Sequence, residues 1–154
     1  MLKRIRKGTQ GGAGGRYAIV AAKYNSQFTD ALVRFAKAEL KDATSVRVIR
    51  VPGAFEVPLV AGRLARSGTV DAVICFGCVL RGATTHADHI VVGVTNALAQ
   101  LQTESGVPMI HGVLLFENEQ QAADRCLRKE TNRGIEAART AREMVQVCRD
   151  LEKF

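Results

Sequence analysis

The chain has 154 residues, which fits one domain of ordinary size. Hydrophobic residues make up 47% of the chain and charged residues 24%, a balance that excludes global disorder. No apolar run approaches the roughly 20 residues that span a bilayer, and no signal-peptide core follows the basic start, so we expect a cytoplasmic protein without a membrane segment.

Basic residues are concentrated at the N-terminus of a chain whose formal charge is +7. The basic residues Lys3, Arg4, Arg6, Lys7 and Arg16 stand in a stretch with no acid before Asp30. We interpret residues 1–16 as a basic, glycine-rich arm with a hinge at residues 8–15, and residues 17–154 as the folded domain. The arm suits a solvated extension, a nucleic-acid contact or the attraction of anionic substrates. No aromatic platform or reading helix accompanies it, so we expect no nucleic acid.

After the arm, strand and helix patterns alternate. Residues 17–22 are nearly all apolar, as expected for a strand covered on both faces. Apolar residues at helical spacing then predict a helix over 28–40. The candidates for its N-cap are Ser26 and Thr29. A second strand follows over 46–51, and Pro58 suits the first turn of a helix that ends near residue 66.

The second half of the chain continues this alternation. Its predicted elements are a strand over 71–80, a helix carrying the apolar residues 90–101, a strand over 109–115, a short helix over 119–126 and a last helix over 133–151. The whole pattern predicts an α/β fold: a single three-layer α/β/α domain with a four-stranded, mainly parallel, flavodoxin-like sheet. Ligands of such folds bind beyond the carboxyl ends of the strands. The segments to inspect are therefore 23–26, 52–56, 80–86 and 116–119.

The cysteines include a C-x-x-C pair, Cys75 and Cys78, inside the strand predicted over 71–80. Residues three apart on a strand point to opposite faces, so the two sulfurs are expected to diverge. No second pair completes a metal tetrad with them. We interpret these cysteines as buried packing thiols and expect no metal and no cofactor.

The loop of residues 81–86, with the sequence RGATTH, precedes a predicted helix. Free N–H groups at a helix start form an anion site, although Thr84 or Thr85 could equally cap an ordinary loop there. His86 opens the helix and titrates near neutral pH, which suits a proton donor, while its alternative is a surface histidine. His89 could join it on a metal, but no third ligand is apparent.

Aromatic, acidic and basic side chains stand at other loops. Tyr24 follows the first strand and can stack on a flat heterocycle, or be simply half-buried. Phe55 and Glu56 follow the second strand and can form an apolar floor and a hydrogen-bonding group for a ligand. Alternatively, Phe55 packs into the core and Glu56 caps a helix. Arg125 and Arg133 flank the turn before the last helix and suit either solvent or a phosphate.

Four of these stretches, in this order, resemble the lumazine synthase family over residues 17–147. The motifs are VPGAFEVP at 51–58, RGATTH at 81–86, GVP at 106–108 and EN-x-x-QA at 117–122. The resemblance implies a transferase of riboflavin biosynthesis. It condenses 5-amino-6-(D-ribitylamino)uracil with 3,4-dihydroxy-2-butanone 4-phosphate, forms 6,7-dimethyl-8-ribityllumazine, and releases phosphate and water.

The resemblance also assigns roles to residues of this chain. His86 stands at the catalytic histidine, a proton donor. The residues at positions that bind the pyrimidine and its ribityl chain are Tyr24, Asn25, Ala54, Phe55, Glu56, Cys78, Val79 and Leu80. Those at positions that hold the sugar phosphate are Ala83, Thr84 and Arg125. His111 falls where a neighbouring subunit of the family contributes Phe, and Arg133 where a basic residue, often Lys, is usual.

The chain departs from the family pattern at a few positions. Tyr24 replaces Phe or Trp, which preserves stacking, whereas His111 replaces an apolar wall by a titratable one. Ala87 stands where Phe or Tyr supports the histidine. Family members form homopentamers, and many pack into 60-subunit icosahedral shells that can enclose riboflavin synthase. Because residues 129–134 lack the insertion of the smaller assemblies, we favour the shell.

Three other functions remain open at this point. A flavin- or lumazine-binding protein without catalysis is suggested by the departures at His111 and Ala87. A flavodoxin-like phosphate-binding module explains the alternation of elements but not the four motifs together. A nucleic-acid-binding assembly would use the basic arm.

Overall fold

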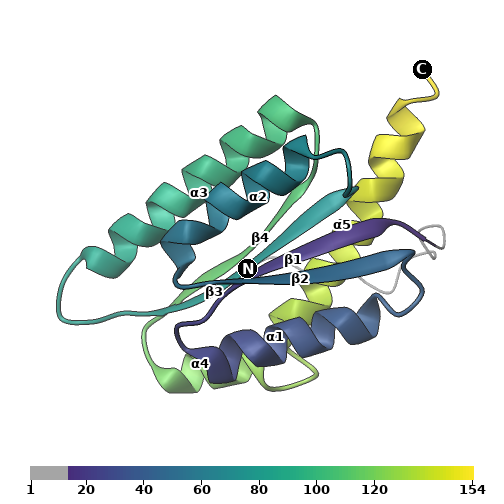
Figure 1. The fold of residues 1–154 in the computed structure, drawn as a ribbon. Helices are drawn as coiled ribbons and strands as arrows, with labels where there is room; N and C mark the ends of the chain where they lie inside the picture. The colour runs from purple at the N-terminus through teal and green to yellow at the C-terminus, as the bar shows by residue number, and fades with distance from the viewer. Residues whose placement is uncertain (1–13) are drawn as a thin grey trace.

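The sheet has four strands that all run in parallel, in the order β2-β1-β3-β4 (Figure 1). The strands are β1 (Arg16–Ala22), β2 (Ser45–Val51), β3 (Ala72–Leu80) and β4 (Met109–Phe116). The computed structural model describes residues 14–154. Residues 1–13 of the arm predicted over residues 1–16 therefore lie outside the described residues. The boundary of the arm stays a prediction.

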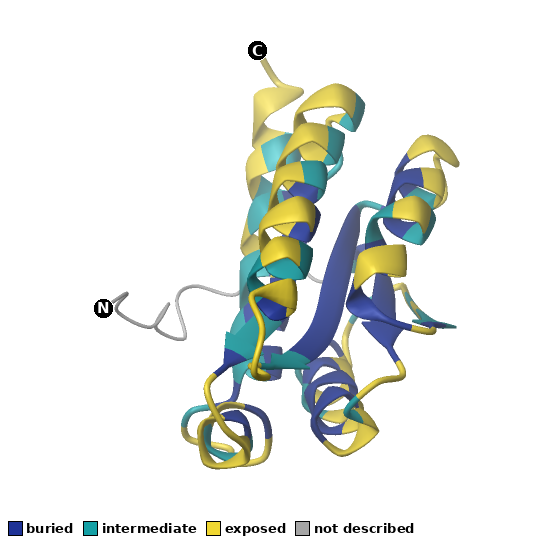
Figure 2. Cartoon of the chain, turned by 90° about the vertical axis from the view of Figure 1, so that its left-hand side faces the viewer, coloured by how far each residue is buried: buried dark blue, intermediate teal, exposed yellow. Residues whose placement is uncertain are grey.

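Helices cover both faces of the sheet. They are α1 (Ser26–Glu39), the single 3₁₀ turn η1 (Ala54–Glu56), α2 (Val57–Arg66), α3 (His86–Ser105), α4 (Glu119–Cys126) and α5 (Arg133–Leu151). Helices α2 and α3 lie on one face, and α1, α4 and α5 on the other (Figure 1). The central strands β1 and β3 are buried between them while the outer helix faces are exposed (Figure 2). The predicted three-layer α/β/α domain is confirmed.

The core consists of two apolar clusters, one on each face of the sheet. Cys78 belongs to the cluster under α1, α4 and α5, and Cys75 to the cluster under α2 and α3. Strand alternation therefore separates the two sulfurs, as predicted. Burial raises the pKa of the Cys75 thiol to about 12, so this side chain stays neutral at physiological pH. It fills apolar space as a packing residue.

Helix α1 begins without the predicted side-chain cap. Asn25 occupies the cap position in a left-handed conformation, with φ 55° and ψ 45°, and no side chain bonds the first turn. Ser26 is already helical, and Thr29 is buried with no hydrogen-bond partner for its Oγ1 among the described residues. The physical reason is that the chain must reverse its direction within the three-residue connection from β1 to α1. Such a reversal needs a residue in the left-handed region, which Asn tolerates.

Helix α5 has a side-chain cap that also joins it to α4. The fully buried Asn132 accepts hydrogen bonds from the N–H groups of Gly134 (2.9 Å) and Ile135 (3.2 Å). Its amide nitrogen donates to the carbonyl of Cys126 at 2.6 Å. Because one side chain serves three buried backbone groups, it fixes the start of α5 against the end of α4.

We expect Asn132→Ala to lower the free energy of unfolding by about 2 kcal/mol, because it removes a cap and leaves buried backbone groups unpaired. Urea denaturation measures this change. Asn132→Asp serves as the comparison, since it keeps the oxygen that caps α5 but replaces the donor to Cys126 by a second oxygen. Equal stability of the wild-type protein and the alanine variant would contradict the assignment.

Candidate active site

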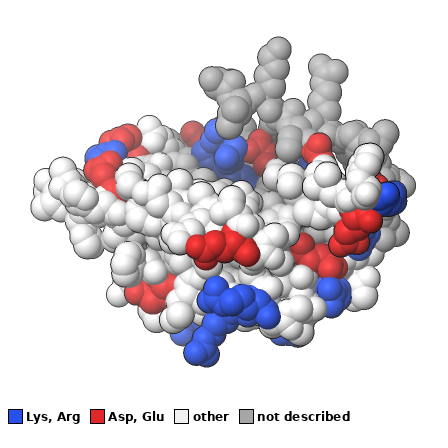
Figure 3. Space-filling view, turned by 90° about the horizontal axis from the view of Figure 1, so that it is seen from above, with Lys and Arg blue, Asp and Glu red and all other residues white. Residues whose placement is uncertain are grey.

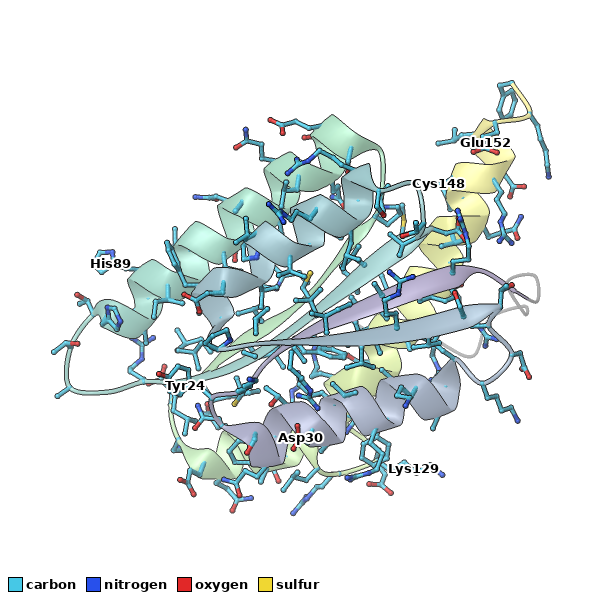
Figure 4. All side chains as sticks on the ribbon, viewed as in Figure 1. Tyr24, Asp30, His89, Lys129, Cys148 and Glu152 are labelled. Atoms are coloured by element: carbon cyan, nitrogen blue, oxygen red, sulfur yellow. The ribbon has the colours of Figure 1, made fainter. Side chains whose placement is uncertain are left out.

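A cavity of about 630 Å³ opens at the carboxyl edge of the sheet. This carboxyl-edge pocket is lined by Ala22, Tyr24, Asn25, Gly53, Ala54, Phe55, Glu56, Cys78, Val79, Leu80, His86, His89 and Ile90. The residues come from the ends of β1 and β3, from η1 after β2, and from the first turns of α3. Tyr24 and His89 lie at this same end of the molecule (Figure 4). The rule for ligands of parallel sheets thus located the pocket from the sequence.

Two large aromatic side chains border this pocket and are exposed. Tyr24 keeps 71% of its surface exposed and Phe55 67%. Tyr24 is therefore not half-buried, and Phe55 does not pack into the core. A Cβ atom at Gly53 would stand 3.2 Å from the Tyr24 ring, so the glycine leaves room for the aromatic side chain. Exposed aromatic faces beside a cavity suit a flat heterocycle.

Two polar side chains hold the pocket wall in place. The Oε2 atom of Glu56 accepts a hydrogen bond from the Gly53 N–H at 2.9 Å, so the capping alternative for Glu56 is confirmed. Asn25 donates from Nδ2 to the Cys78 carbonyl at 2.7 Å and thereby joins the end of β1 to β3. Glu56 has a second carboxylate oxygen, which can accept a bond from a ligand hydroxyl.

His86 is the first residue of α3 and lines the pocket from above the end of β3. Thr85 takes the cap position, but its side chain accepts no bond from the first turn. Thr84 accepts only a long bond, 3.4 Å, from the His86 N–H. The predicted threonine cap is therefore weak, and the N–H groups of this turn remain accessible to an anion.

Five of the predicted site residues do not line this pocket. They are Ala83, Thr84, Arg125, His111 and Arg133. The first two lie in the exposed loop before α3, and Arg125 lies exposed in the last turn of α4. His111 and Arg133 instead line a separate cavity of about 470 Å³ between β4, α3 and α5. Within this chain nine predicted residues thus line the carboxyl-edge pocket, two line the second cavity and three line neither.

His111 takes part in a continuous chain of hydrogen bonds. Its Nδ1 accepts from the Val113 N–H at 3.3 Å, which leaves the proton on Nε2. Nε2 lies 2.7 Å from the Thr95 hydroxyl, which donates to the Val91 carbonyl at 2.7 Å. Partial burial lowers the pKa of His111, and the positive charge of Arg133 acts in the same direction, against a backbone hydrogen bond that raises it. The net shift favours the neutral imidazole.

We expect the stability of the protein to fall as the pH decreases below the ordinary histidine pKa of 6.5, towards the lowered pKa of His111. In that interval the unfolded chain binds a proton that the folded chain excludes, which favours unfolding. Urea unfolding at about pH 7.5 and about pH 5.5 measures this loss. His111→Phe should lose less stability over the same interval, and an identical loss in both proteins would contradict the account.

Sequence reasoning did not assign four of the residues that line the pocket: Ala22, Gly53, His89 and Ile90. Ile90 follows His86 by one helical turn, a spacing that places both on one helix face and could have revealed it. His89 was considered only as a metal ligand. In the part of the chain that the structure describes, no three His, Cys, Asp or Glu side chains are grouped to hold a metal ion. None of the described helices is long and apolar enough to cross a membrane.

A parallel sheet with helices on both faces and an aromatic pocket at its carboxyl edge defines an α/β protein that binds small molecules there. A histidine in this pocket adds a group that can transfer protons. The family model described as 6,7-dimethyl-8-ribityllumazine synthase matches residues 14–149, nearly the whole chain. The chain belongs to the lumazine synthase family, and its activity is the transferase reaction of that family in riboflavin biosynthesis.

Proposed function

We propose that the carboxyl-edge pocket binds the ribitylamino-pyrimidine. The observation that carries this proposal is the convergence of His86 with the exposed rings of Tyr24 and Phe55 on one cavity. Tyr24 stacks on the pyrimidine ring, and Phe55 provides an apolar contact beside it. The end of β3, with Cys78, Val79 and Leu80, lies beside the ring. Ala54 and the second oxygen of Glu56 bind the ribityl chain.

The sugar phosphate is held at the start of α3. Backbone N–H groups at Ala83 and Thr84 face the phosphate, which the positive end of the helix dipole also attracts. Arg125 supplies a guanidinium for a charge-assisted bond, and no hydrogen bond or ion pair within residues 14–154 competes for it. Its exposed position leaves the side chain free to reach a ligand at this edge.

The reaction then needs orientation and proton transfer. The 5-amino group of the pyrimidine attacks the ketone of the sugar phosphate and forms an imine with loss of one water. Elimination releases inorganic phosphate, and the ribitylamino nitrogen closes the ring on the remaining carbonyl carbon with loss of a second water. His86 donates and accepts the protons of these steps. Holding an amine and a ketone together lowers the barrier substantially by itself.

A neighbouring subunit completes the site. His111 and Arg133 lie on the β4 side of the molecule, away from the carboxyl-edge pocket, and β4 is an edge strand of the sheet. Helix α3 contains no Lys or Arg and exposes Val92 by 59%. The face seen from above shows a broad uncharged area (Figure 3). Unpartnered apolar helix faces of this kind suit contact with another copy of the chain.

The assembly is a homopentamer, with packing of pentamers into a 60-subunit shell that can enclose riboflavin synthase. The connection between α4 and α5 spans only residues 127–132, which leaves no inserted segment to block this packing. The protein acts in the cytoplasm. Sedimentation velocity tests the assembly, and a pentamer-sized species at all protein concentrations would refute the shell.

Mixing both substrates with the purified protein tests the function. The lumazine chromophore should appear together with one equivalent of inorganic phosphate. Binding of the pyrimidine without formation of product would instead favour a non-catalytic lumazine-binding protein, the alternative that His111 and Ala87 suggest. The nucleic-acid alternative concerns the basic arm, which lies outside the described residues up to residue 13.

A further inference from the structure

Arg81 joins three elements at the carboxyl edge of the sheet. Its Nε donates to both carboxylate oxygens of Glu117, each at 2.9 Å, and its Nη1 donates to Asp88. Its backbone N–H donates to the Phe116 carbonyl at 2.9 Å. One residue therefore connects the end of β3 with the residue that follows β4 and with the first turn of α3.

The loop that this side chain spans has few other attachments. Residues 81–85 are all exposed, and a Cβ atom at Gly82 would meet nothing within 4 Å. The bonds made by Thr84 and Thr85 side chains are both 3.4 Å long, and neither is a cap of the usual length. The ion pairs of Arg81 are consequently the shortest side-chain attachments of this loop to the rest of the domain.

His86 lies two residues before Asp88 in the same helical turn. A shift of Asp88 relative to the end of β3 therefore moves the imidazole relative to the pocket. We propose that Arg81 is a positioning residue, which fixes the first turn of α3 through Asp88 and Glu117 and so holds His86 over the reacting atoms. This inference rests on the function proposed above.

Direct binding of phosphate by Arg81 is a different role, and its surroundings oppose it. The guanidinium already bonds two carboxylates, so the three side chains together carry a net negative charge. The positive charge of Arg81 is thus already compensated, so Arg81 itself adds little attraction for a phosphate. The hydrogen bond from Arg81, together with its positive charge, also lowers the pKa of Asp88, which keeps the ion pair intact well below neutral pH.

A double-mutant cycle distinguishes the two roles. We expect Arg81→Gln to lower kcat about ten-fold at saturating concentrations of both substrates, because a displaced catalytic group loses rate steeply. In a chain that already carries His86→Ala, Arg81→Gln should cause no further loss of kcat. Losses that multiply would overturn the positioning role. So would an unchanged kcat in Arg81→Gln.

Arg16→Gln is the matched control for folding. Arg16 forms bonds of 3.3 and 2.8 Å with Asp71 at the amino end of β1, remote from the pocket. The substitution Arg16→Gln should lower the thermal stability of the protein without changing kcat. If Arg81→Gln does not fold, Asp88→Asn replaces it in the double-mutant cycle with His86→Ala. This substitution weakens the attachment of Arg81 to α3 and keeps its bonds to Glu117. Absence of lumazine formation by the wild-type chain would refute the proposed function itself, whereas an active wild-type chain with multiplying losses refutes only the role of Arg81.

Discussion

Replacing His86 by alanine is expected to lower kcat about 10²-fold while leaving a readily measurable rate of lumazine formation. The expectation follows from the chemistry at the pocket. An amine and a ketone react readily once they are held in contact. The proposed orientation by Tyr24, Phe55 and the end of β3 does not depend on the imidazole and should persist in the variant. Only the assistance to proton transfer is lost. Steady-state kinetics with both substrates at saturation measure the change.

The comparison variant is His89→Ala, which removes an imidazole from the same helix and the same pocket. Its loss of kcat should be clearly smaller, because the proposed proton donor remains. Two results would contradict the role of His86. Complete inactivation would mean that the imidazole is indispensable to the reaction, and an unchanged kcat would mean that it takes no part in a slow step.

The alternation of strands and helices could be predicted because the two central strands, β1 and β3, are buried on both faces and are accordingly apolar. Strand β1 shows this directly, since every residue after Arg16 is buried. The start of α1 could not be predicted in the same way. Its geometry depends on the short connection from β1 to α1, and propensity for capping by Ser26 or Thr29 was overridden by the left-handed conformation of Asn25.

The pocket was largely predictable, because parallel strands bring their carboxyl ends to one edge of the sheet. The rule selected Tyr24, Glu56 and Leu80 although they are remote in the sequence. It could not decide between the two roles of Glu56, because both need the same carboxylate at the same turn. The structure settles only the bond to Gly53.

His111 and Arg133 mark a different limit of sequence reasoning. They line a cavity on the β4 side, and a site shared between subunits is a property of the assembly rather than of one folded chain. The resemblance to the family supplied the expectation that a neighbour contributes this region. In a single chain, the exposed Val92 on α3 is the feature that supports the proposed contact.

Replacing Arg125 by alanine is expected to reduce kcat/KM for the sugar phosphate by about 10- to 100-fold, mainly through KM. A charge-assisted bond to phosphate contributes roughly 1.5–3 kcal/mol, and the alanine variant forfeits it in the ground state and the transition state alike. The KM for the pyrimidine should hardly change, because stacking against Tyr24 does not involve α4. Initial rates with each substrate varied in turn separate the two constants.

Arg128→Ala controls for the loss of one positive charge from the same region. Arg128 is 66% exposed and pairs with Asp124 at 3.2 Å, so its charge is already compensated, whereas Arg125 has no such partner within the described chain. Its removal should leave the KM for the sugar phosphate within about two-fold of the wild-type value, since exposed ion pairs contribute little. An equal effect of both substitutions would indicate general electrostatic attraction of the anion. An unchanged KM in Arg125→Ala would place the phosphate elsewhere, because a bound phosphate that loses its guanidinium partner cannot keep its affinity.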